Sequence, residues 1–248
     1  MKNIIVLVVI LLFYNCAPKT ITELKPLIDT SSVLANTNTY DGGFSEFGTQ
    51  SRRIAYDSIS SMHCQHKNLS RDFNIDVFIE KKIDTTEGHV SSDVKILLFD
   101  KIRNILFDSI QLHSEFYYGT IFDDCKNVRS YTTGFNKEKE AMDNHYGDIV
   151  VADFNFDDRE DIALINDMGG NAGPLYSFFI QDADRMFKKD IFLTDSMEFF
   201  PAKIDKVKKK LTIYVHAGVC GLGEHIYAYE SNTGLWKEES HKIINICK

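Results

Sequence analysis

No apolar run in this sequence is long enough to cross a bilayer. The longest, residues 4–13, has ten residues, whereas a membrane-spanning helix needs about 20. A short apolar run behind the positive charge of Lys2 is typical of an export signal. We therefore predict a signal peptide at residues 1–15.

Clusters of Lys and Arg are also missing. The net charge is −8, and removal of residues 1–15, which hold one Lys and no acid, makes it −9. The nearest basic run, residues 206–210, is expected at a hairpin turn. Because phosphate binding needs clustered cations, we exclude nucleic acid as a partner. An acidic surface would suit a basic protein partner.

The common catalytic motifs do not occur. The sequence contains no G-x-S-x-G, no H-E-x-x-H, no P-loop and no G-x-G-x-x-G. We therefore predict that the protein is not an enzyme. A glycoside hydrolase remains an alternative, since that chemistry needs only two well-placed carboxylates and the chain has 36 acidic residues.

Cysteine is scarce, and its first occurrence, Cys16, lies three residues after the apolar run. A lipoprotein signal peptidase cleaves before such a cysteine, which is then acylated. Residues 13–15 lack the small side chains usual at that position, so an ordinary secretory signal is the alternative. We predict a lipoprotein of the bacterial cell envelope that contacts the membrane only through its lipid anchor.

Four cysteines remain after Cys16. An even number in an exported chain favours two disulfides, for which three connectivities are possible. Proximity in sequence favours one pair within the first two cysteines and one within the last two; four buried thiols are the alternative. These cysteines are Cys64, Cys125, Cys220 and Cys247.

The rest of the chain divides into a tether at 16–51, rich in Ser, Thr, Asn and Gly, and a domain at 52–248. Within the domain, short segments rich in β-branched and aromatic residues alternate with turn signals. Residues 73–80, FNIDVFIE, show the alternation of a half-buried strand. We predict an all-β domain of antiparallel hairpins in a propeller-like or sandwich arrangement. Little helix is expected beyond the signal peptide, with 136–146 as the one other candidate.

Acidic residues and phenylalanines alternate in residues 153–161, DFNFDDRED. Loops of the D-x-N-x-D type bind calcium through oxygens at positions 1, 3, 5, 7 and 9. Phe154 and Phe156 can then point to the opposite side and anchor the loop in the core. An acidic, solvated turn is the alternative. The predicted ligands are Asp153, Asn155, Asp157, the carbonyl of Arg159, and Asp161.

Two departures distinguish this loop from an EF-hand. Position 6, usually a Gly with positive φ, is Asp158, and position 12, usually Glu, is Leu164. Asp tolerates the left-handed region better than most residues, so the loop is not excluded.

Residues 152–164, ADFNFDDREDIAL, resemble the calcium loop of FG-GAP/VCBS repeats, in a single copy. The longer segment 148–230 is similar to bacterial exported lipoproteins related to the Xanthomonas immunity protein that inhibits a type IV-secreted lysozyme-like effector. This resemblance implies an all-β, calcium-binding fold and a lysozyme-like hydrolase as partner. It matches the calcium motif at four side chains, Asp153, Asn155, Asp157 and Asp161, and departs at Asp158.

The segment GGNAGPLY, residues 169–176, follows the acidic loop. By the resemblance it is a candidate partner-binding loop that enters a glycosidase cleft; a plain connection between strands is the alternative. Its candidate contact residues are Gly169, Gly170, Asn171, Gly173 and Tyr176.

A second motif, HAGVCGLGEH, holds His216, Cys220 and His225. It lacks the fourth ligand and the spacing of a zinc site, so a disulfide cysteine flanked by unrelated histidines is favoured.

The functional hypothesis is an exported calcium-binding lipoprotein that inhibits a lysozyme-like cell-wall hydrolase. The alternative is a calcium-stabilised structural or ligand-binding envelope lipoprotein without an inhibitory role.

Overall fold

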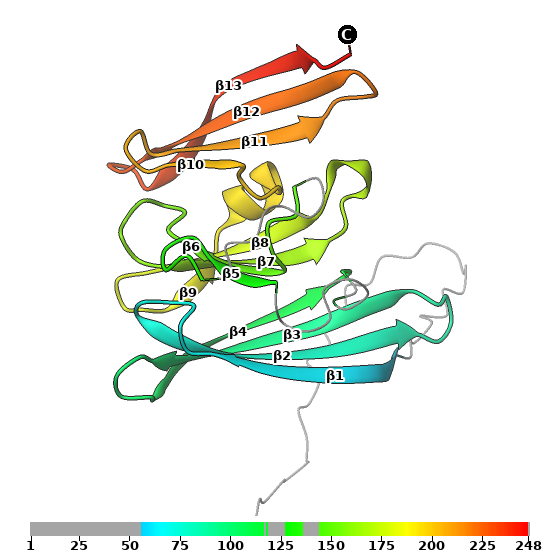
Figure 1. Cartoon of the computed structure of the whole chain (residues 1–248), viewed down its shortest axis with the longest axis vertical. Helices are drawn as coiled ribbons and strands as arrows, with labels where there is room; N and C mark the ends of the chain where they lie inside the picture. The colour runs from blue at the N-terminus through cyan, green and yellow to red at the C-terminus, as the bar shows by residue number, and fades with distance from the viewer. Residues whose placement is uncertain (1–55, 117, 119–126, 136–143, 248) are drawn as a thin grey trace, which may run out of the picture. The chain divides into compact units, whose positions relative to one another are not determined.

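Consecutive hairpins build three β-sheets in the computed structural model, which describes residues 56–116, 118, 127–135 and 144–247 (Figure 1). The predicted signal peptide, the tether and most of the candidate helix at 136–146 lie outside the described residues. No helix in the described part is long and apolar enough to cross a membrane.

The first sheet is a four-stranded antiparallel meander in chain order. Phe73, Ile75 and Val77 of its second strand are fully buried, and the residues between them are more exposed. The predicted alternation is therefore confirmed, because one face of the sheet packs on the core. The strands are β1 (Tyr56–His66), β2 (Phe73–Asp84), β3 (Val90–Asp100) and β4 (Leu106–Ser114).

The second sheet is more deeply buried. Its strands also follow chain order; only β5 and β6 pair in parallel, and the other pairs are antiparallel. The middle strands β6 and β7 are buried on both faces, and β7 and β9 contact β4 of the first sheet. Its strands are β5 (Val128–Ser130), β6 (Ile149–Ala152), β7 (Asp161–Asp167), β8 (Leu175–Gln181) and β9 (Phe187–Lys189).

The third sheet is again an antiparallel meander, and its last two strands are the longest. Two single turns are helical, the 3-10 helix η1 (Gly170–Ala172) and the π-helical η2 (Leu193–Met197). The strands of this sheet are β10 (Lys203–Asp205), β11 (Lys210–His216), β12 (Gly221–Glu230) and β13 (Leu235–Asn245).

The predicted fold class is confirmed: the domain is all-β, with antiparallel sheets packed as in a sandwich and almost no helix. Aromatic side chains fill the space beside the second sheet. Phe154 meets Phe178 and Phe200 edge-on, at centroid distances of 5.1 and 5.7 Å. This aromatic core fixes the loop that follows β6, where the predicted calcium ligands lie.

Candidate functional site

The acidic loop 153–161 joins β6 to β7, as the sequence predicts. Phe154 and Phe156 are both buried, so the predicted aromatic anchors are confirmed. The Phe156 ring also lies 6.1 Å from that of Trp236 on β13. The loop is thereby held between the second and third sheets.

The loop folds around the side chain of Asp153. One carboxylate oxygen of Asp153 accepts the backbone N–H of Asp157 at 3.0 Å, and the other accepts that of Asp158 at 3.1 Å. Asp158 has a φ of 69°, so the position that is usually Gly does take the left-handed conformation here. The Asp153 carboxylate thus holds the turn through two backbone N–H groups.

Asp161 is fully buried at the end of this loop. Its two oxygens accept the backbone N–H groups of Phe154 at 2.8 Å and Gln181 at 2.9 Å. Burial raises the pKa of this carboxyl well above its usual range, and the nearby carboxylates of Asp157 and Asp153 raise it further. A cation among the three would offset this repulsion.

Two basic side chains already balance part of the charge. Lys206 Nζ lies 3.3 Å from Asp153 and 2.5 Å from Asp158, and Arg159 forms an ion pair with Asp157. Among the residues described, the oxygens of Asp153, Asp157 and Asp161 do not lie together as a ready-made metal cluster. The donor set fits a hard cation such as calcium, but Arg159 would first have to release Asp157.

Glu160 is an additional buried carboxylate that the sequence did not single out. It accepts hydrogen bonds from the Ser70 hydroxyl, from Arg71 N–H at 2.8 Å and from Arg71 Nε at 3.2 Å. These bonds tie the loop to the segment before β2. Its partners are about ninety positions away in sequence, so no local pattern could reveal this role.

The glycine-rich segment forms a short loop around η1. Gly169 has a φ of 59°, and a Cβ there would overlap the carbonyl oxygen of Gly173, itself at a φ of 94°. Both positions therefore require glycine. Gly170 and Asn171 are exposed at the tip of the loop.

Asn144 fixes this loop against the third sheet. Its side-chain amide donates to the carbonyl of Ala172 at 2.6 Å and to that of Tyr214 on β11 at 2.9 Å. The base of the loop is therefore held in place, while Met168, Gly170 and Asn171 face outward.

Tyr176, predicted as a contact residue of the partner-binding loop, is buried instead. Only 1% of the residue is exposed. Its hydroxyl donates to the carbonyl of Gly147 at 2.8 Å and accepts the backbone N–H of Tyr146 at 3.3 Å. Burial raises the pKa of this hydroxyl well above its usual range. Tyr176 lies in the core because it belongs to β8, which starts one residue before it. Its buried side chain is therefore not available to a partner.

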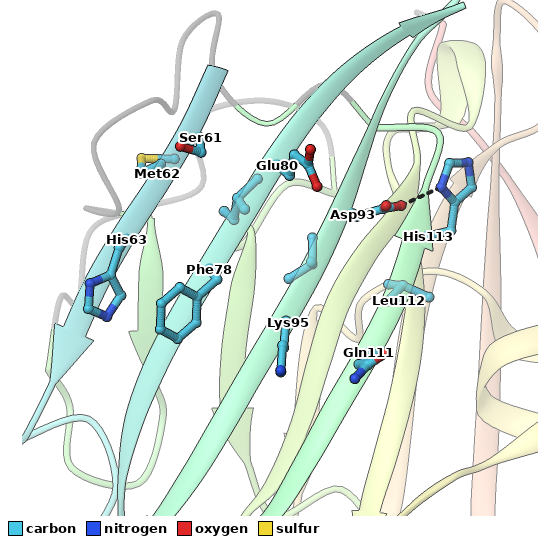
Figure 2. A pocket seen from close by; sticks show the side chains of 12 residues that line it. Ser61, Met62, His63, Phe78, Glu80, Asp93, Lys95, Gln111, Leu112 and His113 are labelled. Atoms are coloured by element: carbon cyan, nitrogen blue, oxygen red, sulfur yellow. Dashed lines mark hydrogen bonds and ion pairs between the residues drawn. The ribbon is translucent and has the colours of Figure 1, made fainter. Parts of the chain in front are cut away.

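The outer face of the first sheet forms a hollow of about 790 Å³ (Figure 2). The rings of His63 and Phe78 stack there in parallel at 4.2 Å, and Phe78 is 37% exposed. Lys95 and Gln111 also line it. Sequence reasoning missed this surface, although Phe78 gives a signal: it is an aromatic residue at an outward position of the alternating segment 73–80.

Asp93 is the most constrained carboxylate of this hollow. It accepts a hydrogen bond from His113 at 2.7 Å and pairs with Lys82 (Figure 2 shows the His113 contact). Partial burial acts to raise the pKa of Asp93, but the hydrogen bonds from Lys82 and His113 outweigh it and lower the pKa. A carboxylate held in this charged form suits binding better than proton donation.

The predicted disulfide between Cys220 and Cys247 is confirmed, with a Cα–Cα distance of 4.9 Å. Cys64 is also disulfide-bonded. Its predicted partner Cys125 and the predicted acylation site Cys16 lie outside the described residues. Cys220 is therefore excluded as a metal ligand, as the sequence indicates.

Comparison with known proteins gives one weak likeness. No family model and no curated protein sequence matches this chain. A solved structure described as "Structure of a Xanthomonas Type IV Secretion System related protein" matches at 15% identity and a TM-score of 0.39. The match covers 75% of this chain and 93% of that chain. It agrees with the resemblance found in the sequence but is too weak to carry an argument about function.

Proposed function

We propose that this protein is a lipid-anchored, calcium-binding protein of the bacterial envelope that binds and inhibits a lysozyme-like cell-wall hydrolase. The observation that carries the proposal is the preformed loop 168–173, whose base is fixed and whose tip is exposed. Loop 153–161 would hold calcium at the start of the same β7–β8 hairpin.

Preorganisation is what an inhibitory loop needs. Gly169 and Gly173 fix an unusual backbone shape, and the hydrogen bonds of Asn144 hold it to β11. A loop that is already ordered loses little entropy on binding, so more of the contact energy appears as affinity. The small tip around Gly170 and Asn171 has the size to enter an active-site cleft.

Charge supports the same proposal. The chain without its signal peptide has a net charge of −9. A strongly acidic protein attracts a basic partner over several ångströms and speeds the encounter. Lysozyme-like hydrolases must approach anionic cell-wall polymers, so a basic surface is expected on them.

Inhibition of purified exported muramidases by the full chain tests this proposal. Asn171→Arg should lower the affinity at least about tenfold, because a charged side chain of that length cannot fit a complementary cleft. Ile102→Arg is the matched control, since Ile102 is 93% exposed on the β3–β4 turn of another sheet. Both variants should keep the wild-type melting temperature. An absence of binding to any muramidase tested would reject the proposal.

A second candidate function is carbohydrate binding at the hollow of the first sheet. The stacked rings of His63 and Phe78 present an exposed aromatic surface beside Lys95 and Gln111. A sugar ring can pack on such a surface while its hydroxyls bond to the polar side chains. Soluble peptidoglycan fragments should then bind the wild type and lose affinity in Phe78→Ala. Fragment binding without inhibition of any hydrolase would favour this second function.

A further inference from the structure

We infer that His225, Glu238 and His241 form a binding site for a divalent transition-metal ion, zinc in particular, on the third sheet. One ligand atom from each residue lies within 4.8 Å of the other two. His225 Nδ1 is 2.9 Å from Glu238 Oε1, and the two imidazole rings stack at 4.1 Å. The site is independent of the acidic loop and of the proposed inhibitory loop.

The register of the last hairpin brings the two histidines together. β12 and β13 pair antiparallel, with His225 directly opposite His241 (Figure 1 shows the strands). Directly opposed residues of an antiparallel pair lie on the same face of the sheet with their Cβ atoms about 5 Å apart. The pairing therefore fixes two imidazoles side by side.

A β-bulge in β13 brings the carboxylate of Glu238 to the same face as the two histidines. In a regular strand Glu238 and His241, three positions apart, would point to opposite faces. Here the register shifts between Ile226 and Tyr227, which pair with Ser240 and Glu238 and leave Glu239 as the extra residue. The bulge turns Glu238 toward the face of the two histidines. Bulges often re-aim a side chain in this way next to functional sites.

The surroundings leave room for an ion. His225 has 24% of its side chain exposed, and Glu238 and His241 are exposed. Gly223 precedes His225 on the same face, and a Cβ there would lie 3.2 Å from its Nε2. Tyr227 lies parallel to the His225 ring on the other side, at 6.3 Å. Along its own strand the imidazole is thus bordered by a glycine and an aromatic ring.

The chemistry of these ligands selects the ion. Two imidazoles and one carboxylate suit zinc, and they leave a fourth tetrahedral position for water or a ligand from outside. The nitrogen lone pairs of stacked rings lie in two parallel planes and do not converge on one point, so one imidazole must rotate about its side-chain bonds for both to bind the same ion. His241 is exposed, so its ring can rotate once it gives up the stacking contact with His225.

Zinc titration of the tag-free full chain in detergent tests the inference. The protein stays oxidised, and the buffer contains calcium to fill oxygen-only sites. We expect saturation at one zinc ion per chain and a higher melting temperature with zinc. His225→Ala and His241→Ala should each weaken binding by at least about tenfold, and Glu238→Gln by a similar factor.

His89→Ala is the matched control, because His89 is an exposed histidine beside an acid, Glu87, at 3.6 Å. It should leave the zinc affinity unchanged. Circular dichroism of each variant checks that the β content is retained. The inference is overturned if zinc does not bind in a saturable way. It is also overturned if His89→Ala weakens binding as much as His241→Ala, or if the double variant of His225 and His241 binds zinc like the wild type.

Discussion

Arg185 Nη1 lies 2.6 Å from Asp100 Oδ2, and this ion pair joins the β8–β9 turn to the end of β3. The Arg185 guanidinium also lies 4.3 Å above the ring of Phe107 on β4. The contact therefore links the second sheet to the first by charge and by cation–π attraction. It connects two turns that are 85 positions apart in sequence.

The ion pair between Arg185 and Asp100 should contribute to the free energy of unfolding at neutral pH and lose that contribution in acid. The backbone N–H of Arg103, followed by the Arg185 side chain and the N–H of Ile102, lowers the pKa of Asp100 to about 2. An unfolded Asp has a pKa of about 3.9. Because the folded value is the lower one, the contribution is complete above the unfolded pKa and is lost as the pH falls through about 2.

Urea unfolding of wild type and Asp100→Asn between acid and neutral pH measures this contribution. The stability difference between them should be constant at neutral pH and should shrink steadily in acid. Asp184→Asn, at an exposed acid in the β8–β9 turn, should show a smaller change. A wild type and an Asp100→Asn variant with parallel pH profiles would contradict the prediction.

The acidic loop predicts calcium-dependent stability. An ion that binds only the folded loop stabilises the protein by about 2.7 kcal/mol at a hundredfold excess over Kd. Chelation should therefore lower the melting temperature, and calcium should restore it better than magnesium, which requires stricter octahedral geometry. Asp157→Ala should remove most of this dependence and keep the β content. Asp205→Ala, at the last residue of β10, is the control. A melting temperature indifferent to chelator would reject the calcium site.

Local features of this loop could be predicted from sequence, and distant ones could not. The burial of Phe154 and Phe156 follows from alternation within a few residues. The clamp between Glu160 and Arg71 spans 89 positions, and nothing near either residue announces it. The cluster of His225 and His241 depends on strand register and on a bulge, which composition does not encode. The prediction that Tyr176 belongs to the partner-binding loop is wrong, because the sequence does not mark where the glycine-rich loop ends and β8 begins.

Removal of the disulfide between Cys220 and Cys247 should lower the free energy of unfolding. The bond joins residues 27 positions apart, one just before β12 and the other just after β13. A crosslink of that span stabilises by roughly 3 kcal/mol when it restricts the unfolded chain. Cys247→Ser should lower the free energy of unfolding by about that amount. Thiol counting on denatured, unreduced wild type should find Cys64, Cys125, Cys220 and Cys247 all oxidised; two or more reactive thiols would contradict this.

The proposed lipid anchor predicts membrane partitioning. Acylated Cys16 should keep the wild-type chain with membranes, since each buried methylene adds about 0.8 kcal/mol of membrane affinity. Cys16→Ser should move the chain to the soluble fraction. Mass spectrometry of the mature N-terminus provides an independent measurement. A wild-type chain that is soluble and carries no lipid would refute the anchor.

Tyr176→Phe separates stability from partner binding. The change deletes only the hydroxyl, which bonds to Gly147 and Tyr146 inside the core. A buried carbonyl and a partly buried N–H would each lose a partner. Stability should therefore fall by about 1–3 kcal/mol in denaturant unfolding. Inhibition of a target hydrolase should stay at the wild-type level below the melting temperature, because the residue is not exposed. Asn171→Arg should instead keep the wild-type stability and weaken inhibition. A Tyr176→Phe variant with wild-type stability and impaired inhibition would return Tyr176 to the binding surface and refute its placement in the core.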